Sequence, residues 1–119
     1  MSKKISQFEV LITRDAESDL ELIHDFLATH FGPKYANTTL DEISKAVSTL
    51  STFPDRGSHP KELLELGIRD FRQLISNRFR IIYRVLESQV VIMLIADSRQ
   101  DMQALLARRV LRANTTSLH

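Results

Sequence analysis

The stretch IRDFRQLISNRFRIIYRVLESQVVIMLIA, residues 68–96, decides the fold of this chain. It contains three β-prone segments, at residues 68–75, 79–86 and 90–96, with polar triplets between them. Connections this short join strands that are antiparallel neighbours. The last segment is apolar on both faces, which is typical of a central strand. The stretch therefore predicts three antiparallel strands, with residues 90–96 inside the sheet.

The middle segment alternates in character along its length. One set of positions is apolar and the other is rich in arginine: Phe79, Ile81, Tyr83 and Val85 against Arg78, Arg80, Ile82 and Arg84. We expect the apolar face to pack on helices and the other face to present its arginines. Tyr83 is expected to be buried, with its hydroxyl bonded to one partner.

Two helices are predicted before this stretch, after a short strand at residues 8–12. Apolar residues recur at helical spacing in both: Ala16, Leu20, Ile23 and Leu27 in the first, and Ala36, Leu40, Ile43, Val47, Leu50 and Phe53 in the second. Thr13 or Asp15 is expected to cap the first helix, and Gly32-Pro33 separates the two. Helices joined this tightly are predicted to form an antiparallel pair on one face of the sheet.

Two shorter helical segments complete the prediction. The connector at residues 54–67 is expected to hold one helical turn. A last helix is expected to begin at Ser98, with Asp101 three residues on, and to run through Val110. The predicted fold is α+β, in the order β-α-α-β-β-β-α, with a mainly antiparallel sheet. A single domain is expected over residues 1–119, with a flexible leader at 1–7 and a flexible tail at 113–119.

The composition excludes several classes of protein. A chain of 119 residues with 43% hydrophobic residues can bury a core without disulfides or a metal. The absence of cysteine excludes a thiol nucleophile and a cysteine-ligated metal site, and it favours a reducing, cytoplasmic location. We find neither a secretory signal nor an apolar run that would span a membrane, so no membrane partner is expected.

The charge is unevenly distributed, although the whole chain carries only +1. Residues 1–59 carry six basic and nine acidic side chains, a net −3, while residues 60–119 carry ten and six, a net +4. Nine of those ten basic residues are arginines, which grip flat anionic groups with two hydrogen bonds. An anion-binding face is predicted from Arg69, Arg72, Arg78, Arg80, Arg84 and Arg99. The alternative is a solvated sheet face with edge-protecting charges.

Metal and nucleotide chemistry are not indicated. The histidines have no ligand spacing, since His24 and His30 lie six apart on one predicted helix, so neither a metal nor another cofactor is predicted. The glycines, Gly32, Gly57 and Gly67, form no phosphate-binding loop. The acidic run of Asp15, Glu17, Asp19, Glu21 and Asp25 is interpreted mainly as the solvent side of the first helix.

The chain resembles a known family over roughly residues 8–112. The resemblance lies in the order and spacing of FEVLIT at 8–13, AESDL at 16–20, FPDRG at 53–57, ELGIRDFR at 65–72, FRIIYRV at 79–85, IADSRQDM at 95–102 and LLARR at 105–109. Together these segments are similar to the RelE/ParE toxin superfamily of bacterial type II toxin–antitoxin systems. The ending LLARR is closer to the ParE-like members.

The resemblance implies the same β-α-α-β-β-β-α fold, a cognate antitoxin that wraps the toxin, and operator DNA bound only through that antitoxin. RelE-like members cut messenger RNA on the ribosome, with basic residues at the scissile phosphate and usually a Tyr or His after the last strand for proton transfer. ParE-like members lack that chemistry and poison DNA gyrase.

Arg80 and Arg99 match basic positions of the superfamily, but no Tyr or His follows Ala96 in the segment DSRQDMQALL. Loss of a general acid or base costs roughly 10²–10⁴-fold in rate, so a non-catalytic gyrase inhibitor is favoured. One alternative is a ribosome-dependent ribonuclease that uses Arg72, Arg80 and Arg99, and another is a basic-faced binding module without toxicity. The predicted partner-binding residues are Arg69, Arg72, Arg78, Arg80, Arg84, Arg99, Leu105, Arg108 and Arg109.

Overall fold

The computed structural model describes residues 7–111, so the predicted tail and all but the last residue of the predicted leader lie outside it. The elements in chain order are β1 (Glu9–Ile12), α1 (Arg14–Phe31), α2 (Pro33–Ser48), the 3₁₀ turn η1 (Thr49–Ser51), α3 (Lys61–Leu64), β2 (Phe71–Ser76), β3 (Phe79–Leu86), β4 (Gln89–Asp97), α4 (Met102–Leu106) and the π-helical turn η2 (Ala107–Leu111). This order confirms the predicted α+β fold, with α3 as the expected helical turn of the connector.

The four strands form one sheet in the order β1-β4-β3-β2. β4 lies between β1, which is parallel to it, and β3, which is antiparallel to it, so the prediction of a central strand is confirmed. The predicted start of β2 at residue 68 is wrong. The Ile68 amide donates to the Leu63 carbonyl at 2.9 Å, and Gly67 takes a positive φ of 77°. The turn that ends α3 therefore occupies residues up to 68, and the strand begins only at Phe71.

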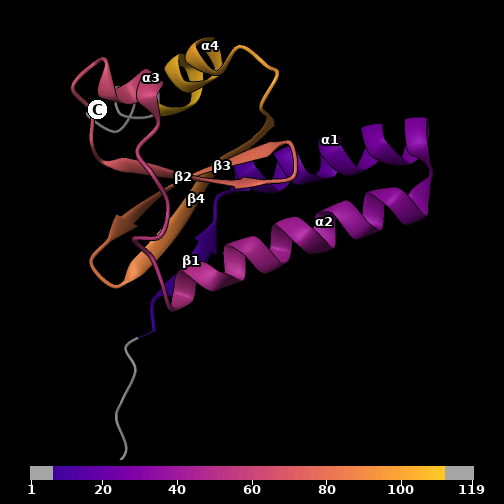
Figure 1. The fold of residues 1–119 in the computed structure, drawn as a ribbon, viewed down its shortest axis with the longest axis horizontal. Helices are drawn as coiled ribbons and strands as arrows, with labels where there is room; N and C mark the ends of the chain where they lie inside the picture. The colour runs from indigo at the N-terminus through magenta and orange to yellow at the C-terminus, as the bar shows by residue number, and fades with distance from the viewer. Residues whose placement is uncertain (1–6, 112–119) are drawn as a thin grey trace, which may run out of the picture.

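The two long helices lie side by side and extend beyond the edge of the sheet (Figure 1). Thr13 caps α1, because its hydroxyl accepts from the Ala16 amide at 3.1 Å. The same hydroxyl donates to the Ile92 carbonyl at 3.0 Å, which ties the start of α1 to β4. Gly32 joins the helices with a φ of 97°, a conformation that side chains with a Cβ rarely adopt.

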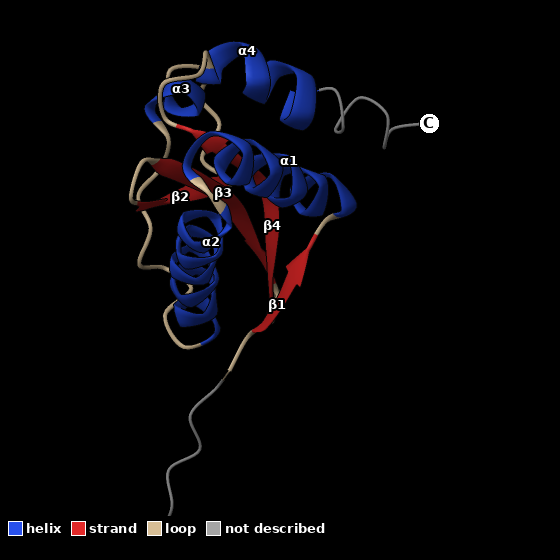
Figure 2. Ribbon diagram, turned by 90° about the vertical axis from the view of Figure 1, so that its right-hand side faces the viewer, coloured by secondary structure: helices blue, strands red, loops and turns tan. Residues whose placement is uncertain are grey.

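Two apolar cores lie on opposite faces of the sheet. Helices α1 and α2 cover one face, while α3 and α4 lie together at one end of the molecule (Figure 2). The larger core includes Leu27, Ile43, Leu50, Ile81 and Tyr83. The smaller core includes Leu63, Phe71, Ile82, Met102 and Leu106. The second face of β3 is therefore largely covered by side chains of α3 and α4, which corrects the prediction that it presents its arginines.

A bulge in β4 allows this strand to serve both cores. Tyr83 pairs with Ile92 and Ile82 pairs with Leu94, so Met93 is an extra residue in β4. An extra residue reverses the face that the following side chains take. Ile92 accordingly packs in the core below α1 and α2, while Leu94 packs in the core below α3 and α4.

Asp101 caps the last helix, α4, because its carboxylate accepts from the Ala104 amide at 3.1 Å, so the prediction of a start at Ser98 is wrong. Ser98 instead lies in the turn after β4, where its amide donates to the Arg78 carbonyl at 2.8 Å. Among residues 7–111, no helix combines the length and the apolar composition needed to cross a membrane.

Candidate functional site

The predicted arginines lie on both faces of the sheet rather than on one. Residues directly opposite each other on neighbouring strands share a face. Arg72 is opposite Tyr83, which packs against the helical pair. Arg84 is opposite Phe71, which packs in the core of α3 and α4. Arg80 shares the face of Arg84, because both lie at even positions of β3. The hypothesis of a single arginine face is therefore wrong.

Arg80 is bonded within the chain. Its Nη1 and Nη2 donate to the two carboxylate oxygens of Glu62 at 2.9 Å each, and its Nε donates to the Gln73 side chain at 2.8 Å. The side chains of Arg80 and Glu62 are only 11% and 16% exposed. The hydrogen bond from Arg80 outweighs the desolvation of Glu62 and lowers the pKa of this carboxyl below its ordinary value. This pair joins β3 to α3.

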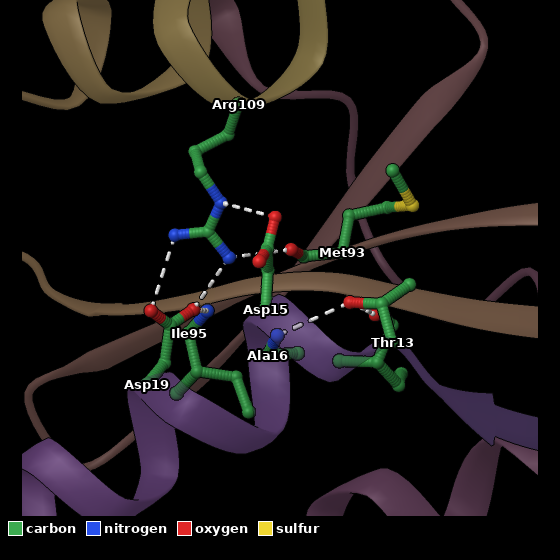
Figure 3. A network of polar contacts seen from close by, with 8 residues as sticks. Thr13, Asp15, Ala16, Asp19, Met93, Ile95 and Arg109 are labelled. Atoms are coloured by element: carbon green, nitrogen blue, oxygen red, sulfur yellow. Dashed lines mark hydrogen bonds and ion pairs between the residues drawn. The ribbon is translucent and has the colours of Figure 1, made fainter. Parts of the chain in front are cut away.

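Arg109 is also bonded within the chain, as Figure 3 shows. Its guanidinium donates to both carboxylate oxygens of Asp19, at 3.1 and 2.9 Å, and to the Met93 carbonyl at 3.0 Å. Asp19 accepts in addition from the Ile95 amide at 3.0 Å. The pairing of β1 with β4 ends at Ile92, so these two side chains bond backbone groups of β4 beyond the end of β1. Asp19, interpreted from the sequence as solvent-facing, has a side chain only 15% exposed.

Tyr83 is buried, as predicted, but its hydroxyl has two partners rather than one. It donates to the Pro54 carbonyl at 2.8 Å and accepts from the Gly57 amide at 3.0 Å. Burial raises the pKa of the Tyr83 phenol above its ordinary value. A Cβ at Gly57 would lie 2.6 Å from both this hydroxyl and the Gln73 carbonyl oxygen, so only glycine fits here. Tyr83 thus fixes the loop of residues 54–58.

A groove lies beside α1, where the turn after β4 approaches the helix. It has a volume of about 400 Å³, and its apolar lining residues are Leu22, Ile23, Phe26, Leu27 and Phe79. Leu22 and Phe26 are 69% and 49% exposed.

Charged residues complete the lining of this groove. Asp97 pairs with Arg78 at 2.8 Å and with Arg99 at 3.6 Å. The Arg99 side chain is 77% exposed, which distinguishes it from Arg80 and Arg109.

A second, polar pocket lies at the start of β2 and the end of β3. It has a volume of about 380 Å³ and is lined by Asp55, His59, Arg69, Asp70, Arg72, Arg84, Val85 and Leu86. It brings together three of the predicted arginines, Arg69, Arg72 and Arg84, although Arg72 and Arg84 leave the sheet on opposite faces, because it lies at the strand ends.

The remaining predicted residues also differ in their exposure and contacts. Leu105 is half-buried against the core of α3 and α4, whereas Arg108 is exposed. His24 contacts Asn37 at 2.9 Å and His30 contacts the Phe26 carbonyl at 2.9 Å. In the described part of the chain, no three His, Cys, Asp or Glu side chains are grouped to hold a metal ion.

Sequence reasoning missed the acids that neutralise these arginines. Glu62, Asp19 and Asp97 bond arginines at positions 80, 109 and 78, so the separations along the chain are 18, 90 and 19 residues. No local periodicity signals a pair of this kind, because the packing of separate elements creates it. The capping role of Asp101 was missed as well, because the sequence pattern indicated Ser98 as the start of α4.

The chain is similar to proteins of a known family. The family described as "ParE toxin of type II toxin-antitoxin system, parDE" matches residues 10–102. Toxin ParE3 of Caulobacter vibrioides is 29% identical over 100 residues, which are 84% of this chain and 96% of that protein.

Two solved structures share the fold. The chromosomal ParDE toxin–antitoxin system from P. aeruginosa aligns with a TM-score of 0.65 and 22% identity, over 77% of this chain and 97% of that one. The toxin–antitoxin complex RelBE2 from Mycobacterium tuberculosis aligns with a TM-score of 0.53 and 20% identity, over 81% and 97%. At these identities the structures show the fold alone, and the match to the family over most of the chain shows more: the chain belongs to the ParE toxin family of type II toxin–antitoxin systems.

Proposed function

We propose that this protein inhibits bacterial growth by binding and poisoning DNA gyrase in the cytoplasm, without catalysis of its own, and that a cognate antitoxin neutralises it. Membership of the ParE family supports the assignment as a toxin. The proposal that the protein acts without catalysis rests on the positions of the side chains that a ribonuclease would need.

Those groups do not converge. Arg72 and Arg80 lie on opposite faces of the sheet, and Arg80 is already bonded to Glu62. A general acid or base must reach the proton that it transfers, within about 3 Å or through one water. The Tyr83 hydroxyl is buried between Pro54 and Gly57, and residues 97–118 contain neither Tyr nor His. This arrangement supports action through protein contacts.

The groove beside α1 supports the proposal of an antitoxin partner. Amphipathic helices bind grooves of this kind through apolar anchors. Leu22 and Phe26 offer exposed apolar surface, and Arg99 offers a charge for an acidic residue beside the anchor. The structural neighbours come from toxin–antitoxin pairs, which supports the same pairing here. Operator DNA would be bound only through the antitoxin.

Paired assays of gyrase and the ribosome test the proposed target. The purified chain should inhibit supercoiling by gyrase or trap cleaved DNA, and it should leave messenger RNA on translating ribosomes intact. Normal supercoiling at saturating, folded toxin would refute the proposal. Codon-specific cleavage that disappears in Arg80→Ala, with folding intact, would establish the ribonuclease alternative.

Expression in cells tests toxicity and the antitoxin. Expression of the chain alone should arrest growth, and co-expression with a small protein encoded by the adjacent reading frame should restore it. Unimpaired growth on unopposed expression would instead favour a binding module without toxicity. Phe26→Asp should weaken the complex with the antitoxin, while Phe53→Asp, also at an exposed aromatic residue but outside the groove, should not.

The exposed arginines allow a matched test of the contact with gyrase. Arg99→Ala and Arg108→Ala should each weaken inhibition several-fold, because both side chains are exposed and belong to the predicted partner-binding set. Arg14→Ala removes an exposed arginine of α1 outside that set and should leave inhibition unchanged. Equal effects of all three substitutions would show that net charge alone matters.

A further inference from the structure

We propose that the polar pocket lined by Arg69, Arg72 and Arg84, called the Arg84 pocket below, binds a carboxylate side chain of a partner protein. Its arginines come from β2, from β3 and from the segment before β2, and they lie around a volume of about 380 Å³. Pockets of this size hold small ligands or side chains of a partner. The proposal does not depend on which protein supplies the carboxylate.

Contacts with the rest of the chain hold two of these guanidiniums in place. Nη1 of Arg72 donates to the carbonyls of Gly57 and Asp55, at 2.7 and 3.3 Å. The guanidinium carbon of Arg84 lies 5.3 Å from the centre of the Phe71 ring, within the range of a cation–π contact. A binding site that is already ordered loses less entropy when its ligand arrives.

These arginines retain capacity for an anion. Arg84 pairs with Asp70 at 4.0 Å and Arg72 with Asp55 at 3.9 Å, the outer limit for an ion pair. Both aspartates are well exposed, at 63% and 82%, so each pair contributes little. Arg80 differs, because its pair with Glu62 is bidentate at 2.9 Å.

The local charge favours a carboxylate over a polyphosphate. Three arginines and two aspartates line this pocket, which gives it a net charge of +1 when His59 is neutral. A single carboxylate balances that charge, whereas a nucleic-acid backbone would bring several phosphates close to Asp55 and Asp70. Val85 and Leu86 line the same pocket and offer apolar contact to a residue beside the acid. The expected occupant is therefore an acidic residue next to an apolar one.

Titration of the full-length chain with a small probe tests the proposal. N-acetyl-Asp-Leu-amide, its Asn-Leu counterpart and inorganic phosphate are added separately, and the Nε–H signals of the arginines are followed by NMR. With the Asp-Leu probe, the signals of Arg72 and Arg84 should shift saturably with one Kd. The Asn-Leu probe should give no saturable shift. The reference signal is that of Arg99, outside the pocket, which should not follow this binding curve.

Variants separate binding from a structural role. Arg84→Lys keeps the charge but loses the planar fork, and should weaken binding about tenfold. If Arg84→Lys proves unstable, Arg69→Gln, at an exposed position, takes its place and should also weaken binding of the Asp-Leu probe. Asp70→Asn removes a competing carboxylate and should tighten binding at least about twofold, an effect that a purely structural arginine would not produce.

Four results would overturn the proposal. These are the absence of a saturable shift with the Asp-Leu probe, equal binding of the Asn-Leu probe, tighter binding of phosphate than of the Asp-Leu probe, and an Asp70→Asn variant whose affinity is unchanged or weaker. Neither gyrase nor an antitoxin is present in this titration. Its failure is therefore distinct from failure of the proposed toxin function.

Discussion

Arg109 in η2 and Asp19 in α1 form a bidentate ion pair across 90 residues of chain, with nitrogen–oxygen distances of 3.1 and 2.9 Å. Both partners also bond the backbone of β4, through the Met93 carbonyl and the Ile95 amide. One pair thus connects the first helix, the central strand and the end of the described chain. Removal of either partner leaves the other charge, and one backbone group, without its bond.

Asp19→Asn and Arg109→Gln should each lower the free energy of unfolding by about 2–3 kcal/mol, because a shielded charge loses its partner. The double variant should lose less than the sum, with a coupling of about 1–3 kcal/mol. Urea denaturation measures both quantities. Asp15→Asn is the matched control, since Asp15 is 75% exposed and 3.7 Å from Arg109, and it should cost no more than about 0.5 kcal/mol. Strict additivity would show that the pair does not act as a unit.

Tyr83→Phe removes the hydroxyl that bonds Pro54 and Gly57. We expect a loss of about 1–3 kcal/mol in unfolding free energy, since a carbonyl and a buried amide lose their partner. Hydrogen exchange should show faster exchange of the Gly57 amide in the variant. Tyr35→Phe, at a tyrosine 43% exposed in α2, should leave stability and exchange unchanged.

Gly57→Ala should be destabilising for a steric reason. The new Cβ would lie 2.6 Å from the Gln73 carbonyl oxygen, a backbone atom that cannot move without disturbing β2. A loss of about 1–3 kcal/mol in unfolding free energy is expected, comparable to overpacking in a core. Ser58→Ala changes the neighbouring exposed side chain and keeps the backbone pairing with Gln73, so its melting temperature should match that of the parent chain.

The ion pair of Glu62 with Arg80 predicts a pH dependence of stability. Because the folded chain lowers the pKa of Glu62 below its ordinary value of about 4.5, the pair stabilises the folded state fully above that pH. This contribution is lost as the pH falls through the lowered pKa. The difference in unfolding free energy between the parent chain and Glu62→Gln should therefore be constant near pH 7 and shrink below about pH 4.5. A difference that grew on acidification would contradict this assignment.

Much of the fold was predictable because it rests on local patterns. The helical spacing from Ala36 to Leu50 and the capping hydroxyl of Thr13 are signals that neighbouring residues carry. The turn at residues 76–78 was equally readable from its polar residues and its length, and Asn77 adopts a positive φ of 59° there. Such features need no knowledge of distant parts of the chain.

The candidate site was less predictable, because its arrangement depends on tertiary packing. Arginine enrichment indicated the basic half of the chain correctly, but it did not distinguish Arg80, bonded to Glu62, from the exposed Arg99. It also placed Arg72 and Arg80 on one face, although strand register separates them. The covering of the second face by α3 and α4 depends on where the connector packs, and no periodicity reports this.

The extra residue at Met93 also constrains how this chain tolerates change in length. In β4, side chains alternate between the two faces of the sheet, and this alternation changes phase at Met93. Before Met93 the even-numbered positions face α1 and α2, and after it the odd-numbered positions do. Deletion of Met93 would restore a regular ladder in which Leu94 stays opposite Ile82 and Ile95 stays opposite Ile81, so both side chains would keep their present cores, while the carbonyl that Arg109 bonds would be lost. The bulge is therefore the position of this strand at which the chain can be shortened by one residue without moving side chains from one layer of the protein to the other.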